Sequence, residues 1–515
     1  MRLVICCNTT DQLIIQVNSA FSANCWERLS LVLRVTRSAN RQNALYFSLH
    51  RSAACPGGEI IRQCGFSSVY IPTGVFIIAS RHLPSVTTVS RLGAIAAAVL
   101  LLVTCTSKAP KSLVTASKPP VTQKSVKNQQ PVRGVWITTV SRLDWPPVGS
   151  IIASSPESRI SQQKLALIAK LDNLQRLGIN TVFFQVKPDG TALWDSHILP
   201  WSDMLTGKIG ENPGYDPLQF MLDEAHKRGM KVHAWFNPYR VSVNTKPATI
   251  AELNHTLTQV PASVFVLHRN WIRTASDRFV LDPGIPEVRD WITSIVAEVV
   301  QNYPIDGVQF DDYFYTETPG STLNDNQTYQ RYGQGYASKA DWRRHNTQQL
   351  IAQVSQTIKK LNPQVEFGVS PAGVWRNRSH DPAGSDTRGA AAYDESYADT
   401  RSWVQQGLLD YIAPQLYWPF ARDAARYDVL AKWWADVVKP THTRLYIGVA
   451  LYKVGEPSKN EPDWMVDGGV PELKKQIDLN ETTPGIQGTI LFRENNLNQP
   501  QTKQAVQYLQ QRWGS

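Results

Sequence analysis

The sequence predicts a (β/α)8 barrel, or TIM barrel, preceded by a signal segment and a flexible linker. From residue 132 onward, eight short apolar runs alternate with amphipathic helical stretches, which is the pattern of a parallel sheet. These units fill about 385 residues, with long insertions after several strands. A doubly wound open sheet is the alternative. No G-x-G-x-x-G follows any of the apolar runs, which counts against a dinucleotide site.

The predicted strands are short apolar segments bounded by turn-forming residues. In chain order they span 134–139, 180–186, 231–236, 307–311, 366–370, 411–416, 445–450 and 488–492. The predicted helices span 165–177, 217–228, 286–303, 342–361, 397–408, 427–438, 471–479 and 501–513. Parallel strands need such crossover helices between them, so the order of elements fits a barrel.

Side-chain parity predicts where polar groups gather. Successive strand residues point to opposite faces, and the apolar face of each strand should pack against the helices. In strand 307–311, Val308 and Phe310 then face the helices, while Gln309 and Asp311 point into the barrel. The same parity directs Gln185, Lys187, His233, Trp235, Asn237, Gln415 and Tyr417 inward, and Ser370 ends the fifth strand. Barrel enzymes carry their chemistry at the carboxyl ends of the strands, so we expect the site there.

Asp311 and Asp312 are the candidate catalytic residues. A buried carboxylate is costly unless it is paired, so an apolar strand that ends in adjacent acids and aromatic residues indicates a site. Carboxylates can transfer protons or attack an anomeric carbon, and rings stack on sugars, so the cluster points to glycan chemistry. The alternative is that one aspartate caps the next segment or binds a structural cation. Asp399 and Glu494 are alternative acids or bases.

The candidate substrate-binding residues lie at strand ends or just beyond them. They are Gln185, Lys187, Trp235, Asn237, Arg240, Tyr313, Ser370, Gln415 and Tyr417. Lys187 needs a partner if it is buried and charged, and Asp311 or a substrate carboxylate would serve. His233 and Gln309 lie deeper and are expected to be structural. Further aromatic residues in loops after strands could stack on sugar rings: Trp194, Trp201, Tyr315, Trp375 and Trp418.

Several other chemistries lack their signatures. The sequence has no H-x-x-x-H or cysteine-rich metal spacing, no G-x-S-x-G and no P-loop, so we expect neither a metal nor a cofactor. After residue 105 the chain has 44 basic and 40 acidic residues. This near balance argues against a nucleic-acid partner, although the whole chain carries a net charge of +10.

The first 105 residues differ in composition from the remainder. They contain no lysine, nine arginines and all six cysteines of the chain. Residues 1–80 show no clear periodicity. We interpret them as an N-terminal extension that is non-functional or results from a mis-called start codon, and that does not contribute to the fold. An unusual functional extension is the alternative.

The pattern of residues 81–104 predicts a lipoprotein signal peptide. Arg81 and Arg91 precede a 12-residue apolar run, 92–103, which is too short to span a bilayer and suits a signal sequence. The following Cys105 ends a lipobox-like segment, in which Thr104 departs from the usual Gly, Ala or Ser. We therefore expect a lipid anchor on Cys105 and a flexible linker to residue 131, before the barrel domain at 132–515. An ordinary signal peptide or a short membrane anchor is the alternative.

Six segments of the barrel domain resemble glycosyl hydrolase-like family 10, a TIM-barrel family. They are RGVW at 133–136, FQVKP at 184–188, HAWFNPYR at 233–240, LDPG at 281–284, GVQFDDY at 307–313 and GVSP at 368–371. The resemblance covers about residues 131–515. It implies a hydrolase of O-glycosyl bonds.

With the lipobox and the linker, the resemblance implies a protein that cleaves the glycan strands of peptidoglycan during cell separation, preferably strands stripped of stem peptides. It implies a lipid anchor on the periplasmic face of the outer membrane, because Thr106 rather than aspartate follows the cysteine, and septal division proteins as partners. Two mechanisms stay open: Asp311 is the nucleophile or base with a second carboxylate as acid, or Asp311 orients a substrate acetamido group while Asp312 protonates the leaving oxygen. The alternatives are an inactive septal glycan-binding protein and a hydrolase of another amino-sugar polysaccharide.

Overall fold

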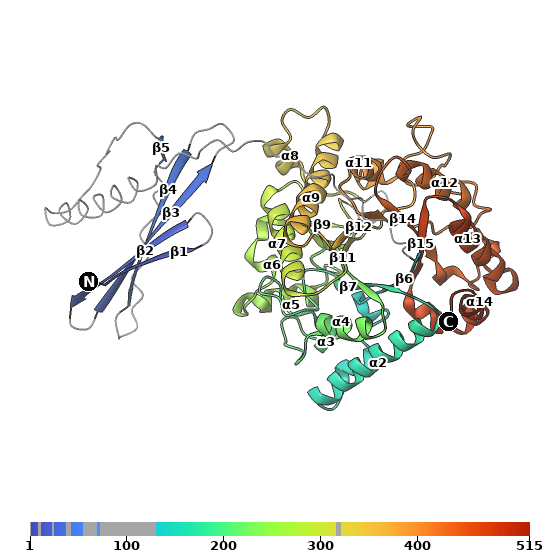
Figure 1. Cartoon of the computed structure of the whole chain (residues 1–515), viewed down its shortest axis with the longest axis horizontal. Helices are drawn as coiled ribbons and strands as arrows, with labels where there is room; N and C mark the ends of the chain where they lie inside the picture. The colour runs from blue at the N-terminus through green and yellow to red at the C-terminus, as the bar shows by residue number, and fades with distance from the viewer. Residues whose placement is uncertain are drawn as a thin grey trace, which may run out of the picture. The chain divides into compact units, whose positions relative to one another are not determined.

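The computed structural model describes residues 130–315 and 321–514 and, before them, five strands (Figure 1). The chain divides into two compact units, residues 1–123 and 124–515. Five strands of the first unit form an antiparallel sheet in sequential order: β1 (Arg2–Asn8), β2 (Gln12–Ser22), β3 (Cys25–Arg37), β4 (Asn43–Ala54) and β5 (Tyr70–Pro72). We predicted no element here, although β3 has an apolar residue at every second position from Leu29 to Val35. The signal segment, Cys105 and most of the linker lie outside the described residues.

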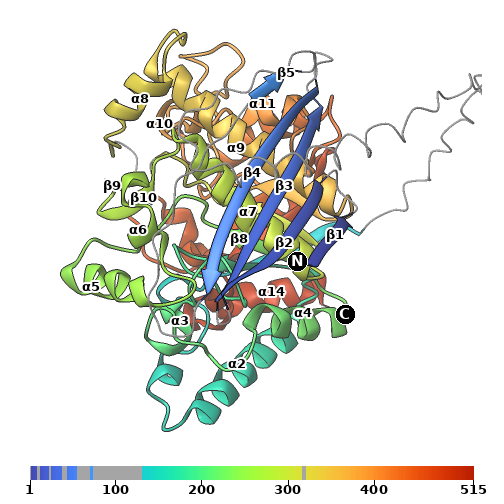
Figure 2. The same ribbon diagram turned by 90° about the vertical axis from the view of Figure 1, so that its left-hand side faces the viewer.

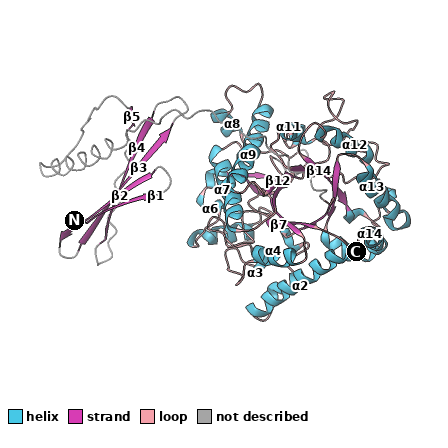
Figure 3. Ribbon diagram, viewed as in Figure 1, coloured by secondary structure: helices cyan, strands magenta, loops and turns pink. Residues whose placement is uncertain are grey.

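Eight parallel strands of the second unit close into a barrel, with the helices outside it (Figure 3). They are β6 (Val132–Ile137), β7 (Thr181–Lys187), β8 (Lys231–Phe236), β11 (Gly307–Phe310), β12 (Glu366–Val369), β13 (Tyr411–Ile412), β14 (Arg444–Ala450) and β15 (Ile486–Phe492). Pairing of β15 with β6 closes the ring. The predicted (β/α)8 barrel is confirmed, and the open sheet is excluded.

The helices that surround the barrel begin where the sequence provides caps. Ser155 caps α2 and Asp216 caps α4, each followed by a proline at the first helical position. The longer helices are α2 (Pro156–Arg176), α4 (Pro217–Lys227), α7 (Pro286–Asn302), α9 (Lys339–Leu361), α12 (Tyr427–Val438), α13 (Val470–Thr482) and α14 (Lys503–Trp513). The shorter ones are α3 (Asp203–Thr206), α5 (Pro247–His255), α6 (Val264–Leu267), α8 (Asn326–Tyr332), α10 (Ala392–Glu395) and α11 (Thr400–Gln405). Within the described part of the chain, no helix has the length and apolar character needed to cross a bilayer.

The barrel has two apolar cores, and both follow the predicted parity. Val308 and Phe310 belong to the outer core, between strands and helices. The interior is filled by Trp136, Phe183, Trp235, Tyr411, Ala413, Tyr446 and Ile490. Gly307 leaves room for His233, because a Cβ there would lie 2.4 Å from the imidazole. Burial lowers the pKa of His233 to about 4, and its Nδ1 lies 3.0 Å from the Tyr411 hydroxyl, so this histidine is a neutral interior residue.

The insertion after β8 contains a hairpin that the sequence analysis did not predict. It consists of β9 (Ile272–Ala275) and β10 (Arg278–Leu281), and it follows α5 and α6 in the chain (Figure 2). Arg240, just past the end of β8, forms an antiparallel bridge with Val280 of β10. The hairpin thereby brings a distant segment to the mouth of the barrel.

Candidate active site

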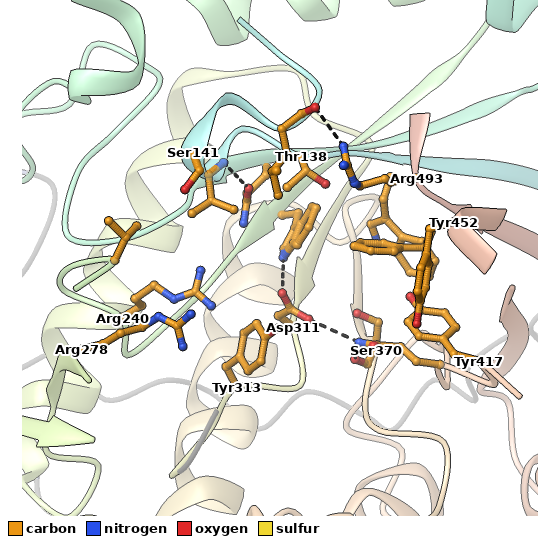
Figure 4. Close-up of a pocket in the computed structure, with 18 residues that line it drawn as sticks. Thr138, Ser141, Arg240, Arg278, Asp311, Tyr313, Ser370, Tyr417, Tyr452 and Arg493 are labelled. Carbon is orange, nitrogen blue, oxygen red and sulfur yellow. Dashed lines mark hydrogen bonds between the residues drawn. The ribbon is translucent and has the colours of Figure 1, made fainter. Parts of the chain in front are cut away.

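A cavity of about 500 Å³ opens at the carboxyl ends of the strands (Figure 4). Its lining includes the predicted residues Gln185, Trp235, Arg240, Asp311, Tyr313, Ser370, Gln415 and Tyr417. It also includes residues that we did not predict: Trp136, Thr138, Val140, Ser141, Leu143, Val243, Arg278, Tyr452, Phe492 and Arg493. All eight strands or the loops just after them contribute side chains, so the closed barrel itself assembles this site.

Asp311 lies at the centre of the lining and accepts hydrogen bonds from four N–H groups. Its Oδ2 accepts from Trp235 Nε1 at 3.1 Å and from Asn237 Nδ2 at 3.0 Å. Its Oδ1 accepts from the backbone N–H of Asp312 at 2.9 Å and from Gln415 Nε2 at 3.4 Å. Nitrogen donors on both oxygens suit the ionised form of a carboxyl group. The bond from Gln415 is the longest, so Gln415 is the donor that a substrate N–H would displace most easily, and Oδ1 would accept the new bond.

Asp312 is half-buried and does not line the cavity wall, but it interacts with two groups that do. Burial raises its pKa well above the usual range, and the charge of Asp311 and a hydrogen bond between the two carboxyls raise it further. A hydrogen bond with Gln415 opposes this shift. The pair thus places a carboxyl group with four N–H donors beside a carboxyl group whose pKa is raised, and two carboxyls in such different environments can divide the acid and base roles of catalysis.

Gln185 and Asn237 hold the first of these carboxylates in place. Gln185 Oε1 accepts from the backbone N–H groups of Thr139 and Val140, at 2.9 and 2.8 Å. Gln185 Nε2 donates to Asn237 Oδ1 at 2.7 Å, which leaves the amide nitrogen of Asn237 to face Asp311. Asn237 is fully buried and does not line the cavity, so its contact is with the carboxylate rather than with a ligand.

The prediction that Asp311 or a substrate carboxylate pairs with Lys187 is wrong. Its Nζ donates to the backbone carbonyls of Asn237, Pro238 and Arg240, at 2.8, 3.3 and 3.3 Å, and it does not reach the cavity. Three carbonyl acceptors match the three N–H groups of an ammonium, although burial lowers the pKa of Lys187 to about 7. Lys187 therefore fixes the loop that carries Asn237 and Arg240.

Asp399 and Glu494, the alternative acids, also lie away from the cavity. Asp399 Oδ1 caps α11 by accepting from Ser402 N at 3.3 Å, and it accepts from Trp375 Nε1 at 2.9 Å. Glu494 is fully buried and forms an ion pair with Lys170 of α2. Burial raises the pKa of both carboxyls, yet both have structural partners where the barrel meets its helices.

The loop aromatic residues divide into two groups. Tyr313 and Tyr417 line the cavity, whereas Trp194, Trp201, Tyr315, Trp375 and Trp418 do not. Trp194 is buried and its Nε1 donates to Glu298 at 2.9 Å, so a structural contact rather than a sugar accounts for this aromatic residue in the loop. The rings that join Tyr417 at the cavity are Phe492, with centroids 5.6 Å apart, and Tyr452, at 5.8 Å.

Arg493 follows β15 and lies at the cavity edge with a partner of its own. Its Nη1 donates to Asp144 Oδ1 at 2.5 Å and to the Leu143 carbonyl at 2.9 Å. Asp144 also accepts from the backbone N–H of Thr138 at 2.7 Å. Parity applied to strand 488–492 would have placed Phe492 on the inward face with Ile490, whereas Arg493 lies beyond the strand and parity does not predict it.

A closed barrel with adjacent aspartates at its mouth and aromatic side chains in the cavity wall is the arrangement of glycoside hydrolase-like proteins. The family model "Glycosyl hydrolase-like 10" matches residues 131–466, and the chain belongs to this family. In the described residues, no cluster of three His, Cys, Asp or Glu side chains could hold a metal ion.

Relatives support this assignment over most of the chain. "Glycosyl hydrolase DigH" of Escherichia coli K12 is 76% identical over 431 residues, which cover 83% of this chain and 98% of that protein. "Glycosyl hydrolase YngK" of Bacillus subtilis 168 is 42% identical over 377 residues, 73% of this chain and 70% of that protein. A solved structure, "Alpha-L-fucosidase isoenzyme 2 from Paenibacillus thiaminolyticus", matches with a TM-score of 0.43 and 13% identity, over 75% of this chain and 49% of that one. A similarity this low adds nothing to the assignment.

Proposed function

We propose that this protein hydrolyses glycosidic bonds between amino sugars in the glycan strands of peptidoglycan. The observation that carries the proposal is the Asp311–Asp312 pair at the barrel mouth. One carboxylate has four N–H donors, and the pKa of its neighbour is raised well above the usual range. This pairing supplies a proton for the leaving oxygen and a negative charge beside the reacting centre.

The closeness of the two carboxyls favours the substrate-assisted route. Catalytic carboxyls of retaining enzymes lie about 5–5.5 Å apart, and those of inverting enzymes about 6.5–9.5 Å apart. Asp311 and Asp312 are adjacent in sequence and share a hydrogen bond, which is closer than either arrangement. In this route Asp312 protonates the glycosidic oxygen, and Asp311 Oδ1 accepts the N–H of a substrate acetamido group whose oxygen attacks the anomeric carbon. Water then opens the cyclic intermediate.

The direct test is to incubate the purified protein with peptide-free peptidoglycan glycan. We expect shorter oligosaccharides whose masses correspond to addition of one water per bond broken. Borohydride reduction of the products, followed by complete hydrolysis, identifies the sugar at the new reducing end. NMR during the reaction shows which anomer of the product forms first. Retention supports the substrate-assisted route, and inversion refutes it. Binding without cleavage would instead favour the inactive glycan-binding alternative.

We also propose that the protein acts at the division septum, anchored through Cys105 to the periplasmic face of the outer membrane, with septal division proteins as partners. This proposal rests on the 12-residue apolar run, the lipobox-like segment and the polar linker that follows. Metabolic labelling with a fatty-acid probe should mark the wild-type protein and leave Cys105→Ser unlabelled. Equal labelling of both proteins would refute the anchor.

A further inference from the structure

A second cavity lies beside the first at the carboxyl ends of the strands. Its volume is about 410 Å³, and its walls come from Arg422 in the loop after β13 and from residues 452–461 in the loop after β14. Tyr452 lines both cavities, so the two hollows meet at its side chain. Figure 4 shows Tyr452 beside Tyr417 on one side of Asp311, and the second cavity continues on that side.

Tyr452 presents an exposed ring between the two cavities. The side chain is 37% exposed, although two other rings pack against it. Tyr417 lies 5.8 Å from it between centroids, and Phe492 lies 6.0 Å from it, both nearly at right angles. These contacts fix the orientation of the Tyr452 ring. An exposed apolar surface with a polar rim is typical of a ligand-binding groove, and a ring held in this way can stack on a sugar.

The loop that carries Tyr452 is held in place by hydrogen bonds. Lys453 Nζ donates to Glu461 Oε2 and to the Tyr417 carbonyl, both at 2.6 Å. Glu461 is 8% exposed, and its backbone N–H donates to Ser458 Oγ at 3.1 Å. A wall fixed in this way loses little conformational entropy when a ligand binds to it.

The lining of the second cavity offers both hydrogen-bond donors and acceptors. Ser458 supplies a hydroxyl, Asn460 an amide and Arg422 a guanidinium. Glu456 adds a carboxylate, of which Oε1 accepts from Gln501 Nε2. Within the described part of the chain, the side chains of Arg422 and Asn460 have no hydrogen-bond partner, so ligand groups can reach them. Sugar hydroxyls and acetamido groups donate and accept hydrogen bonds, and this mixture of groups matches them.

We propose that the second cavity binds sugars of the same glycan strand beyond the bond that is cleaved, with Tyr452 as the ring that joins the two sites. This inference rests on the proposed function and adds the length of strand that the protein recognises. A glycan strand is a linear polymer, so it has to leave the first cavity, and the shared wall at Tyr452 gives it a path. The two cations and the two carboxylates of the second lining balance, which suits an uncharged sugar face. Binding energy from sugars remote from the reacting centre can accelerate the reaction.

The test measures cleavage of peptide-free glycan fragments that are separated by length, from disaccharides to octasaccharides. Strands that still carry stem peptides are tested in parallel. The proteins are the wild type, Arg422→Ala, Asn460→Ala, the double variant and the control Lys459→Ala. Lys459 is the exposed neighbour of Asn460 and lines neither cavity. Arg422 is half-buried and Asn460 is exposed, so we expect all the variants to fold.

The wild-type kcat/KM should rise with fragment length, because long fragments reach the second cavity. Losing one hydrogen bond to a neutral group weakens binding about 2- to 10-fold. Each single variant should therefore lower kcat/KM for long fragments by about this factor, with a smaller change for short ones. The double variant should remove most of the advantage of long fragments. Lys459→Ala should keep the wild-type dependence on length.

Two results would overturn the inference: a wild-type kcat/KM that does not depend on length, or an equal loss by the double variant at every length. A loss confined to strands with stem peptides would assign the second cavity to the peptide and would also overturn it. If the wild type cleaves no glycan, the proposed function fails by itself. Calorimetric binding of the same fragments to the wild type and the double variant then decides the inference separately. Equal affinity of the two proteins for long fragments would refute it.

Discussion

Asp311→Asn should fold and lose glycan cleavage by at least about 10²–10⁴-fold, the contribution of a single acid–base group. The substitution removes the charge beside the reacting centre and keeps the shape of the side chain. An amide can accept from Trp235 and Asn237 only if its NH₂ group faces the N–H donors of Asp312 and Gln415. We therefore expect a loss of stability of about 1–3 kcal/mol, well short of unfolding. Product formation and chemical denaturation measure the two effects.

Asp306→Asn is the matched control, because Asp306 lies just before the opposite end of the same strand. Its carboxylate accepts from Val232 N at 2.8 Å and lies 2.9 Å from His226 Nε2, away from the cavity. Residues at the amino-terminal face of a barrel support stability rather than chemistry. Asp306→Asn should therefore cleave glycan normally. Near-normal cleavage by Asp311→Asn would refute the catalytic assignment.

Asp312→Asn should lose activity on glycan about 10²–10⁴-fold yet retain much of it on aryl glycosides with good leaving groups. Such leaving groups depart without a proton, so they no longer need the acid. The wild type should lose activity as pH rises through the raised pKa of Asp312, because the acid is then deprotonated. This alkaline decline should be absent from the activity of Asp312→Asn on aryl glycosides. Equal losses on both substrates would exclude Asp312 as the acid.

The same substitution should stabilise the fold. An unfolded aspartate has a pKa of about 3.9, whereas burial and Asp311 raise the pKa of Asp312 in the folded protein. Between these two pKa values the folded state holds a proton that the unfolded state has released, so wild-type stability falls as pH rises. Asparagine removes this dependence. We expect Asp312→Asn to be more stable than the wild type at pH 7, with a smaller difference near pH 4. Urea unfolding at both pH values tests this.

The sequence was sufficient to predict the barrel and its central carboxylate. Apolar periodicity and caps such as Ser155 are properties of contiguous residues, so the eight barrel strands and the eight helices that alternate with them could be located from local sequence. Parity then fixed the inward side of each strand, and Asp311 lies at the mouth for that reason. Trp235, Gln185 and Gln415 reach the site by the same rule.

Only the tertiary structure decided which polar groups meet. Lys187 does not reach the cavity, because the register of β7 shifts between Gln185 and Lys187 and carbonyls of the β8 loop bind its ammonium group. Asp399 lies at the start of α11 and Glu494 just after β15, and their partners Trp375 and Lys170 lie outside the cavity. Arg278 reaches the cavity through an antiparallel pairing across an insertion. Periodicity depends on neighbouring residues, whereas the partner of a long polar side chain depends on how distant segments pack, and a single sequence does not encode that packing in any local pattern.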